Sequence, residues 1–136
     1  MTAPHAMLIA LLVALPALLS GCTAEAAGSR TVAADSDDLA MAGMTDGGLW
    51  QSAPWSDSAW MELGARATVE VEHGLGSQPA SVLVYLSFVE DDRGDTSKRT
   101  SFPAAGDVAN LHAVTDTTVT IKNTTYGEFY MRLALQ

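Results

Sequence analysis

The sequence is poor in cysteine, in basic residues and in aromatic side chains. Cys22 is the only cysteine among 136 residues, which excludes a disulfide scaffold or a cysteine-rich zinc site within one chain. Lys and Arg total 7 against 16 Asp and Glu, and the net charge of −9 argues against a basic nucleic-acid footprint. Hydrophobic residues make up 48%, enough to build a buried core, and the length suits one domain rather than two.

Charged residues are absent from the first 21 positions. Residues 6–19 form an apolar run of 14 residues that only Pro16 interrupts. A bilayer span needs about 20 residues, so this run is too short to cross comfortably. Its length matches the apolar part of a secretory signal peptide. We therefore expect residues 1–21 to be a signal peptide that is removed.

The apolar run ends in Leu19-Ser20-Gly21-Cys22, which is a leucine and two small residues before the only cysteine. This resembles the lipobox of bacterial lipoproteins. The resemblance implies a diacylglycerol thioether on Cys22, cleavage just before it, and stable anchoring by two or more acyl chains. It also implies a place in the cell envelope, and Thr23 implies the outer membrane where the source has one. The alternative is an uncleaved N-terminal anchor with an incidental free cysteine.

Residues 22–48 contain no aromatic side chain and are dominated by Ala, Gly, Ser, Thr and Asp. Such a segment buries too little apolar area to offset the entropy lost on ordering. We expect a flexible acidic linker between the lipid and a domain at 49–136. At 5–6 Å times the square root of its length, about 26 residues reach roughly 25–30 Å.

Residues 49–136 carry the pattern of an all-β domain. Apolar side chains fall at every second position in 67–72, 117–122 and 128–135, as in half-buried strands. Residues 81–89 are apolar nearly throughout, which indicates a central strand covered on both faces. Segments 50–60 and 108–114 add short strands. The pattern predicts a small antiparallel two-sheet β-sandwich of six to eight strands.

Two local features refine this picture. In 128–135, Phe129, Met131, Leu133 and Leu135 face one side, and Tyr130 faces outward on the other. Residues 123–127 (NTTYG) have the composition of a hairpin turn, so we expect the last two strands to pair directly.

Residues 73–79 read HGLGSQP, between an alternating strand and the long apolar strand. This resembles the H-x-L-G-x-x-P β-sandwich modules of bacterial surface and phage tail proteins, and is distantly similar to the H-type lectin sandwich. The resemblance implies the fold, a carbohydrate-binding module as one candidate function, and a homo-oligomer, because such modules often assemble.

Four side chains are candidates for ligand binding. Trp55, Tyr126 and Tyr130 are suited to stacking on sugars or to a hot spot for a protein partner. The alternative is that the tryptophans plug the open end of a small sandwich. His73 has the chemistry of a base or a metal ligand. Its place before Gly74-Leu75-Gly76 favours a structural role in which the ring caps amides of the turn.

Motifs for catalysis and for metal binding are missing. The acidic loop 90–95 lacks the residue order of an EF-hand, so a solvated loop tip is favoured over a calcium site. Within it, Arg93-Gly94-Asp95 matches the integrin-binding tripeptide, which is a weak signal. No nucleophile motif, paired-carboxylate motif or phosphate-binding loop occurs. We expect no enzyme, no cofactor and no metal.

These observations lead to one hypothesis and three alternatives. The hypothesis is a membrane-anchored, non-catalytic binding module that presents loops 73–79, 91–106 and 123–127 to a protein or glycan. The alternatives are a structural envelope lipoprotein, a lectin-like module, and a small hydrolase built on His73 or His112. An exposed apolar patch favours assembly, whereas a concave aromatic site favours ligand binding.

Overall fold

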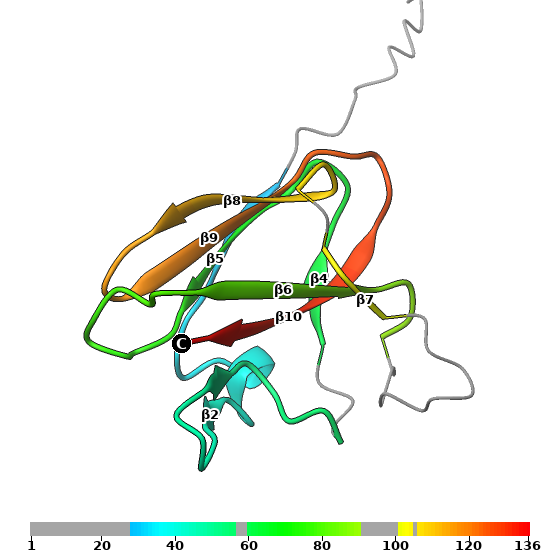
Figure 1. Ribbon diagram of the computed structural model, residues 1–136. Helices are drawn as coiled ribbons and strands as arrows, with labels where there is room; N and C mark the ends of the chain where they lie inside the picture. Colours follow the sequence, from blue (N-terminus) through cyan, green and yellow to red (C-terminus); the bar gives the residue numbers. More distant parts are fainter. Residues whose placement is uncertain (1–27, 57–59, 91–100, 105) are drawn as a thin grey trace, which may run out of the picture.

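The computed structural model describes residues 28–56, 60–90, 101–104 and 106–136 (Figure 1). Within these ranges the chain forms strands and one 3-10 turn, with no α-helix. In chain order the elements are β1 (Ser29–Val32), η1 (Asp37–Leu39), β2 (Gly43–Met44), β3 (Trp50–Gln51), β4 (Met61–Leu63), β5 (Thr68–Glu72), β6 (Val82–Ser87), β7 (Phe102–Pro103), β8 (Ala109–Val114), β9 (Thr118–Asn123) and β10 (Phe129–Leu135).

The strands form two sheets that pack as a sandwich (Figure 1). The four-stranded sheet has the order β1-β5-β9-β8, and the six-stranded sheet has the order β2-β3-β10-β6-β7, with β4 also paired to β10. Neighbours run antiparallel except β1 and β5, which are parallel. The prediction of an all-β, two-sheet sandwich is confirmed, with ten strands in the described part instead of six to eight.

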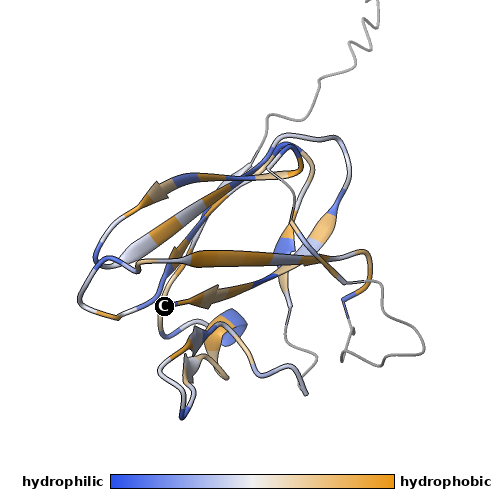
Figure 2. Ribbon diagram, viewed as in Figure 1, coloured by the Kyte–Doolittle hydropathy of each residue, from blue (hydrophilic) through white to orange (hydrophobic). Residues whose placement is uncertain are grey.

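The core lies between the sheets and follows the alternation in the sequence. Val69 and Val71 of β5 are buried, and the side chains that alternate with them, Thr68, Glu70 and Glu72, are partly exposed. Each fully buried Val or Leu side chain contributes about 1.5–3 kcal/mol relative to an exposed one. Figure 2 shows the most apolar residues concentrated on the central strands. The inner side of β10 is buried throughout, at Phe129, Met131, Leu133 and Leu135.

The folded part begins earlier than the sequence predicts. Residues 28–48 were expected to be linker, but β1 pairs with β5 and β2 pairs with β3, so this segment joins both sheets. Val32 and Leu39 are only 2% and 3% exposed in the core. The linker prediction is therefore wrong for 28–48. The average composition of the segment is a poor guide here, because two buried apolar side chains and strand pairing can keep a mostly polar segment in the folded structure.

The last two strands do not form a hairpin. β9 lies in the four-stranded sheet and β10 in the six-stranded sheet, so residues 123–127 cross between sheets. Asn123 is fully buried, and its amide donates to the carbonyls of Gly64 and Gly127 at 2.8 and 2.7 Å. The hairpin prediction is wrong, because the same residue types serve tight turns and inter-sheet corners.

The outer face of the six-stranded sheet is only partly covered. On the outer side of β10, Pro54, Trp55 and Trp60 contact Arg132. Ser52 exchanges hydrogen bonds with the backbone of Leu133 and continues the pairing of β3 with β10. Arg132, on this outer side of β10, is consequently only 2% exposed. On β6, Leu83 is 49% exposed, so the expectation that 81–89 is covered on both faces is wrong for this position.

Candidate functional site

A groove of about 650 Å³ lies at the end of the sandwich where β1 and β5 begin. Small residues of 64–67 form part of its wall. The side chains that give it chemical character are Arg30, Glu62, Arg66, Tyr126 and Glu128. Gly28, the first residue that the structure describes, also lines it. The groove is thus built from three segments far apart in the sequence.

Arg66 and Tyr126 form the most prominent contact of this groove. The guanidinium carbon lies 5.3 Å from the centre of the tyrosine ring, a cation–π geometry. Arg66 Nη1 donates to the Thr124 carbonyl at 3.0 Å, and the Arg66 amide donates to the Thr125 carbonyl at 2.9 Å. Both the side chain and the backbone of Arg66 therefore hold the loop that presents Tyr126.

The backbone of Arg66 is left-handed, with φ of 57°. This conformation costs a residue with a Cβ roughly 1–2 kcal/mol, so it persists only where other contacts offset it. The bonds to Thr124 and Thr125 supply that compensation. Strain of this kind often accompanies functional sites and makes Arg66 a residue of interest.

Arg30, in contrast, is committed to local structure. Its Nη1 atom lies 2.7 Å from Asp38 Oδ2, and its Nη2 atom donates to the Glu62 carbonyl at 2.8 Å. Both side chains of the ion pair are 40% exposed, so the pair itself contributes at most about 1 kcal/mol. Of the two arginines in the groove, Arg66 is the one that pairs with an exposed aromatic ring.

His73 lies in a turn at the other end of the four-stranded sheet. It is 4% exposed, and its Nδ1 atom accepts a 3.2 Å hydrogen bond from the amide of Leu75. Gly74 and Gly76 in this turn have φ of 62° and 70°, which favours glycine there. The ring also contacts Trp50 edge-on, at 6.4 Å between centres. These contacts are those that the turn-capping interpretation predicts.

Trp55 belongs to an aromatic cluster on the outer face of the six-stranded sheet. Its ring meets Tyr85 at 4.7 Å and Trp60 at 6.2 Å between centres, both in T-shaped geometry. The Arg132 guanidinium lies 4.5 Å from Trp60 and 5.6 Å from Trp55. Trp55 is 38% exposed, whereas Trp60 is buried. The cluster thus holds Trp55 and Trp60 on the sheet, and Trp50 packs separately in the core.

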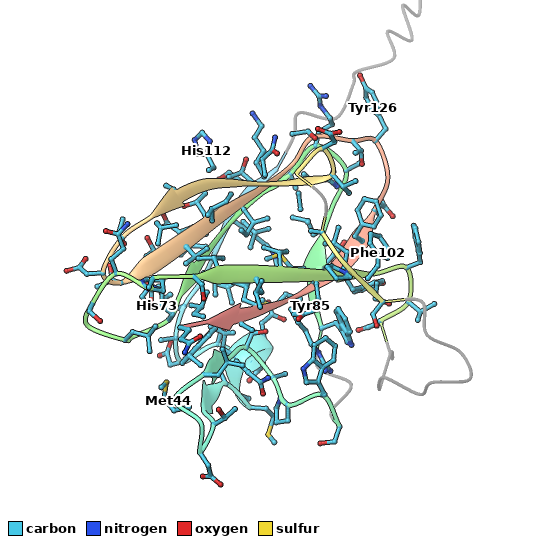
Figure 3. All side chains as sticks on the ribbon, in the orientation of Figure 1. Met44, His73, Tyr85, Phe102, His112 and Tyr126 are labelled. Carbon is cyan, nitrogen blue, oxygen red and sulfur yellow. The ribbon has the colours of Figure 1, made fainter. Side chains whose placement is uncertain are left out.

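The four candidate residues do not meet in one site. Thr68 pairs with Lys122 and Glu72 with Thr118, so loops 73–79 and 123–127 lie at opposite ends of the four-stranded sheet. At about 3.4 Å per residue, five residues separate these ends by roughly 17 Å. Figure 3 shows His73 and Tyr126 well apart.

Only Tyr126 among the four candidates lines the groove, and it is 85% exposed. Tyr130 is half-buried on β10, on the side opposite the core. Arg66 and Arg132 were not singled out by the sequence analysis. Arg132 could have been noticed in the sequence, because it is a charged residue within the apolar pattern of 128–135. Nothing local marks Arg66, because its partners come from residues 124–126.

Several expectations concern the acidic loop. Residues 91–95, including the Arg93-Gly94-Asp95 tripeptide, lie outside the described residues, and Glu90 is exposed.

His112 is exposed on β8 (Figure 3). Among residues 28–56, 60–90, 101–104 and 106–136, no three His, Cys, Asp or Glu side chains converge as a metal site would require. In the same ranges no helix has the length and apolar character to span a membrane.

Comparison of the chain with protein-family models, with curated proteins and with solved structures found no match. The resemblances to bacterial lipoproteins and to H-x-L-G-x-x-P modules therefore stay predictions from the residues.

Proposed function

We propose that this chain is a lipid-anchored protein of the bacterial cell envelope, attached through Cys22, whose sandwich is a non-catalytic binding module. The observation that carries the binding role is the concave site at Tyr126, whose ring is 85% exposed and braced by Arg66. A large exposed ring held in one orientation loses little side-chain entropy on contact with a ligand. The N-terminal motif supports the anchor.

The chemistry of the groove favours a hydroxyl-rich ligand. Arg66 offers hydrogen-bond donors, whereas Glu62 and Glu128 offer acceptors. Hydroxyl groups both donate and accept, so they match this mixed lining, and the Arg66 guanidinium can also bind an anionic group on the same ligand. The Tyr126 ring supplies a stacking face. A volume of about 650 Å³ lies within the usual range for small ligands.

The anchor is tested in the full chain expressed in a bacterium. We expect the native protein to fractionate with membranes and to have the mass of a chain that begins at an acylated Cys22. Cys22→Ala removes the acceptor thiol, and we expect this variant to lose the acyl mass. An intact, unacylated N-terminus on the native protein overturns the anchoring proposal.

The binding site is tested with the acylated full chain in detergent on a glycan array. Tyr126→Ala removes the stacking face and is expected to weaken binding about tenfold, equivalent to about 1.4 kcal/mol. Met44→Ala is the matched control, because Met44 is also exposed (58%) but lies in β2, away from the groove (Figure 3). Glycan binding that survives Tyr126→Ala unchanged, or no glycan binding by the native chain, contradicts this assignment.

A structural role in a larger envelope assembly is the second candidate, and one observation favours it. Leu83, Phe88 and Val89, on β6 and just after it, are 49%, 63% and 45% exposed. Exposed apolar side chains that are contiguous on the surface are typical of faces that pack against a partner, and Phe88 and Val89 are adjacent. Loss of co-purifying envelope proteins in a Leu83→Ser, Phe88→Ser variant, with binding to glycans absent, would favour this candidate.

A further inference from the structure

We infer that the groove end of the sandwich lies against the membrane that carries the anchor, and that the groove takes the headgroup of an anionic, hydroxyl-bearing lipid. This inference rests on the proposed lipid anchor at Cys22 and names the ligand class of the same groove. Three observations support it, namely the length of chain outside the described fold, the distribution of charge along the sandwich, and the chemistry of the groove.

The chain between Cys22 and the fold is short. Six residues, 23–28, separate Cys22 from Ser29, where β1 begins. At no more than about 3.6 Å per residue, seven steps span at most roughly 25 Å, whatever conformation they adopt. A domain of about 109 residues has a radius of gyration of about 13 Å, so its diameter exceeds that reach. The anchor therefore favours orientations in which the Ser29 end stays close to the lipid.

The groove lies at that same end. Gly28 lines it directly, and Ser29 pairs with Thr68 at the start of β5. Gly28 connects directly to the short segment that leads to Cys22, so the groove is the part of the described fold from which this segment departs. The loop with Tyr126 is held over this edge by Arg66, whose amide binds the Thr125 carbonyl.

The exposed basic residues of the described part of the chain are concentrated at the same end, and one of them, Arg30, is paired with Asp38. The described part of the chain has four Lys and Arg residues, and the three that are not buried are Arg30, Arg66 and Lys122. Arg30 pairs with Val69, Lys122 pairs with Thr68, and Arg66 precedes Thr68 by two residues. The carboxylates that lie with them in the groove are Glu62 and Glu128.

The opposite end of the four-stranded sheet is acidic. Glu72 ends β5, and its Oε2 atom accepts a 3.1 Å hydrogen bond from the amide of Ala34, beside Asp35. Asp116 lies in the turn between β8 and β9, at the same end. An anionic bilayer surface attracts basic groups and repels acidic ones within about a Debye length, so the groove end is the one that it favours.

The groove side chains match a lipid headgroup. A guanidinium binds phosphate oxygens in a forked geometry, which Arg66 is placed to do at the rim. Glu62 and Glu128 can accept hydrogen bonds from the hydroxyls of a glycerol or sugar headgroup. Tyrosine is enriched at membrane interfaces because its ring is apolar and its hydroxyl is wet, and Tyr126 is 85% exposed.

The experiment uses the acylated full chain in vesicles, with a fluorophore sensitive to its environment attached to one new cysteine. Ala65→Cys places it at the groove and leaves Arg66 and Tyr126 intact, and Tyr126→Cys is a second position that tolerates a label because it is exposed. Asp116→Cys is the control at the opposite end. Vesicles contain phosphatidylcholine alone or phosphatidylcholine with phosphatidylglycerol, and circular dichroism checks that each variant folds.

We expect the groove probes to shift to shorter emission wavelengths and to be quenched by nitroxide-bearing lipids, more strongly with phosphatidylglycerol present. The probe at Asp116→Cys is expected to keep the emission wavelength of a fluorophore that is surrounded by water. Adding Arg66→Gln should reduce the extra emission shift and quenching that phosphatidylglycerol causes at the groove probes. Free glycerol phosphate, without vesicles, should not reproduce the shift. Equal quenching at both ends, with Cys22 acylated by mass, overturns this inference alone. A mass without acyl chains overturns the anchor and this inference together.

Discussion

The guanidinium carbon of Arg132 lies 4.5 Å from the centre of the Trp60 ring, although Arg132 sits on a strand that is otherwise apolar. Its Nη1 atom donates a 2.8 Å hydrogen bond to the Pro54 carbonyl. Burying a charge is costly unless hydrogen bonds and aromatic faces compensate for lost water. The arginine thereby binds Pro54, Trp55 and Trp60 to the outer face of β10.

Replacing this arginine should destabilise the fold. Arg132→Met keeps much of the volume but removes the contacts to Trp60 and Pro54, and we expect it to lower the free energy of unfolding by about 2–4 kcal/mol. Arg132→Lys keeps the charge without the planar group and should give an intermediate loss. Urea unfolding followed by tryptophan fluorescence measures both. A midpoint unchanged in Arg132→Met would contradict the role assigned to this contact.

Asn123 should be equally sensitive, for a different reason. Asn123→Ala removes a fully buried amide and leaves the carbonyls of Gly64 and Gly127 without their donor and Thr125 without its acceptor. We expect a loss of about 2–3 kcal/mol in unfolding free energy. Lys122→Ala is the control, because this neighbouring side chain is exposed and should stay within about 0.5 kcal/mol. Similar midpoints for the two variants would show that the crossing does not depend on Asn123.

The extent of the folded part can be tested with two residues of the same segment. Leu39→Ala removes a core side chain and is expected to cost about 2–5 kcal/mol. Met41→Ala alters a side chain that is 52% exposed and should change stability by less than about 0.5 kcal/mol. Thermal or urea unfolding distinguishes them. Were residues 28–48 a linker, both substitutions would leave the midpoint unchanged.

The turn after β5 depends on an acceptor at position 73. His73→Leu leaves the Leu75 amide without its partner and is expected to cost about 1–3 kcal/mol, whereas His73→Asn supplies another acceptor and should cost less. Hydrogen exchange at the Leu75 amide is the direct measurement, with faster exchange expected in His73→Leu. Unaltered exchange in His73→Leu would remove the turn-capping role.

Much of the secondary structure follows from the sequence because a period of two is a local property. Val69 and Val71, or Met131 and Leu133, mark the inner face of a strand without reference to any partner. The same alternation predicted the all-β class and the two sheets. The turn at His73 was also accessible, since a histidine followed by glycines indicates both the bend and a side chain that can cap it.

The site was less accessible. Tyr126 was a candidate from its place in a turn, but its partner Arg66 lies 60 residues earlier in the chain, and no local pattern joins the two. Val32 and Leu39 stand among polar neighbours, and only pairing with β5 and the shape of the core explain why they are buried.

The sequence by itself determined that the segments of β5, β6, β9 and β10 are strands and which cysteine resembles an acylation site, because both depend on neighbours in the chain. Tertiary structure alone decided that β9 and β10 belong to different sheets, that residues 28–48 join both sheets, and that Arg66 meets Tyr126. Those outcomes depend on contacts between distant segments, whose free energies appear only once the sheets have packed.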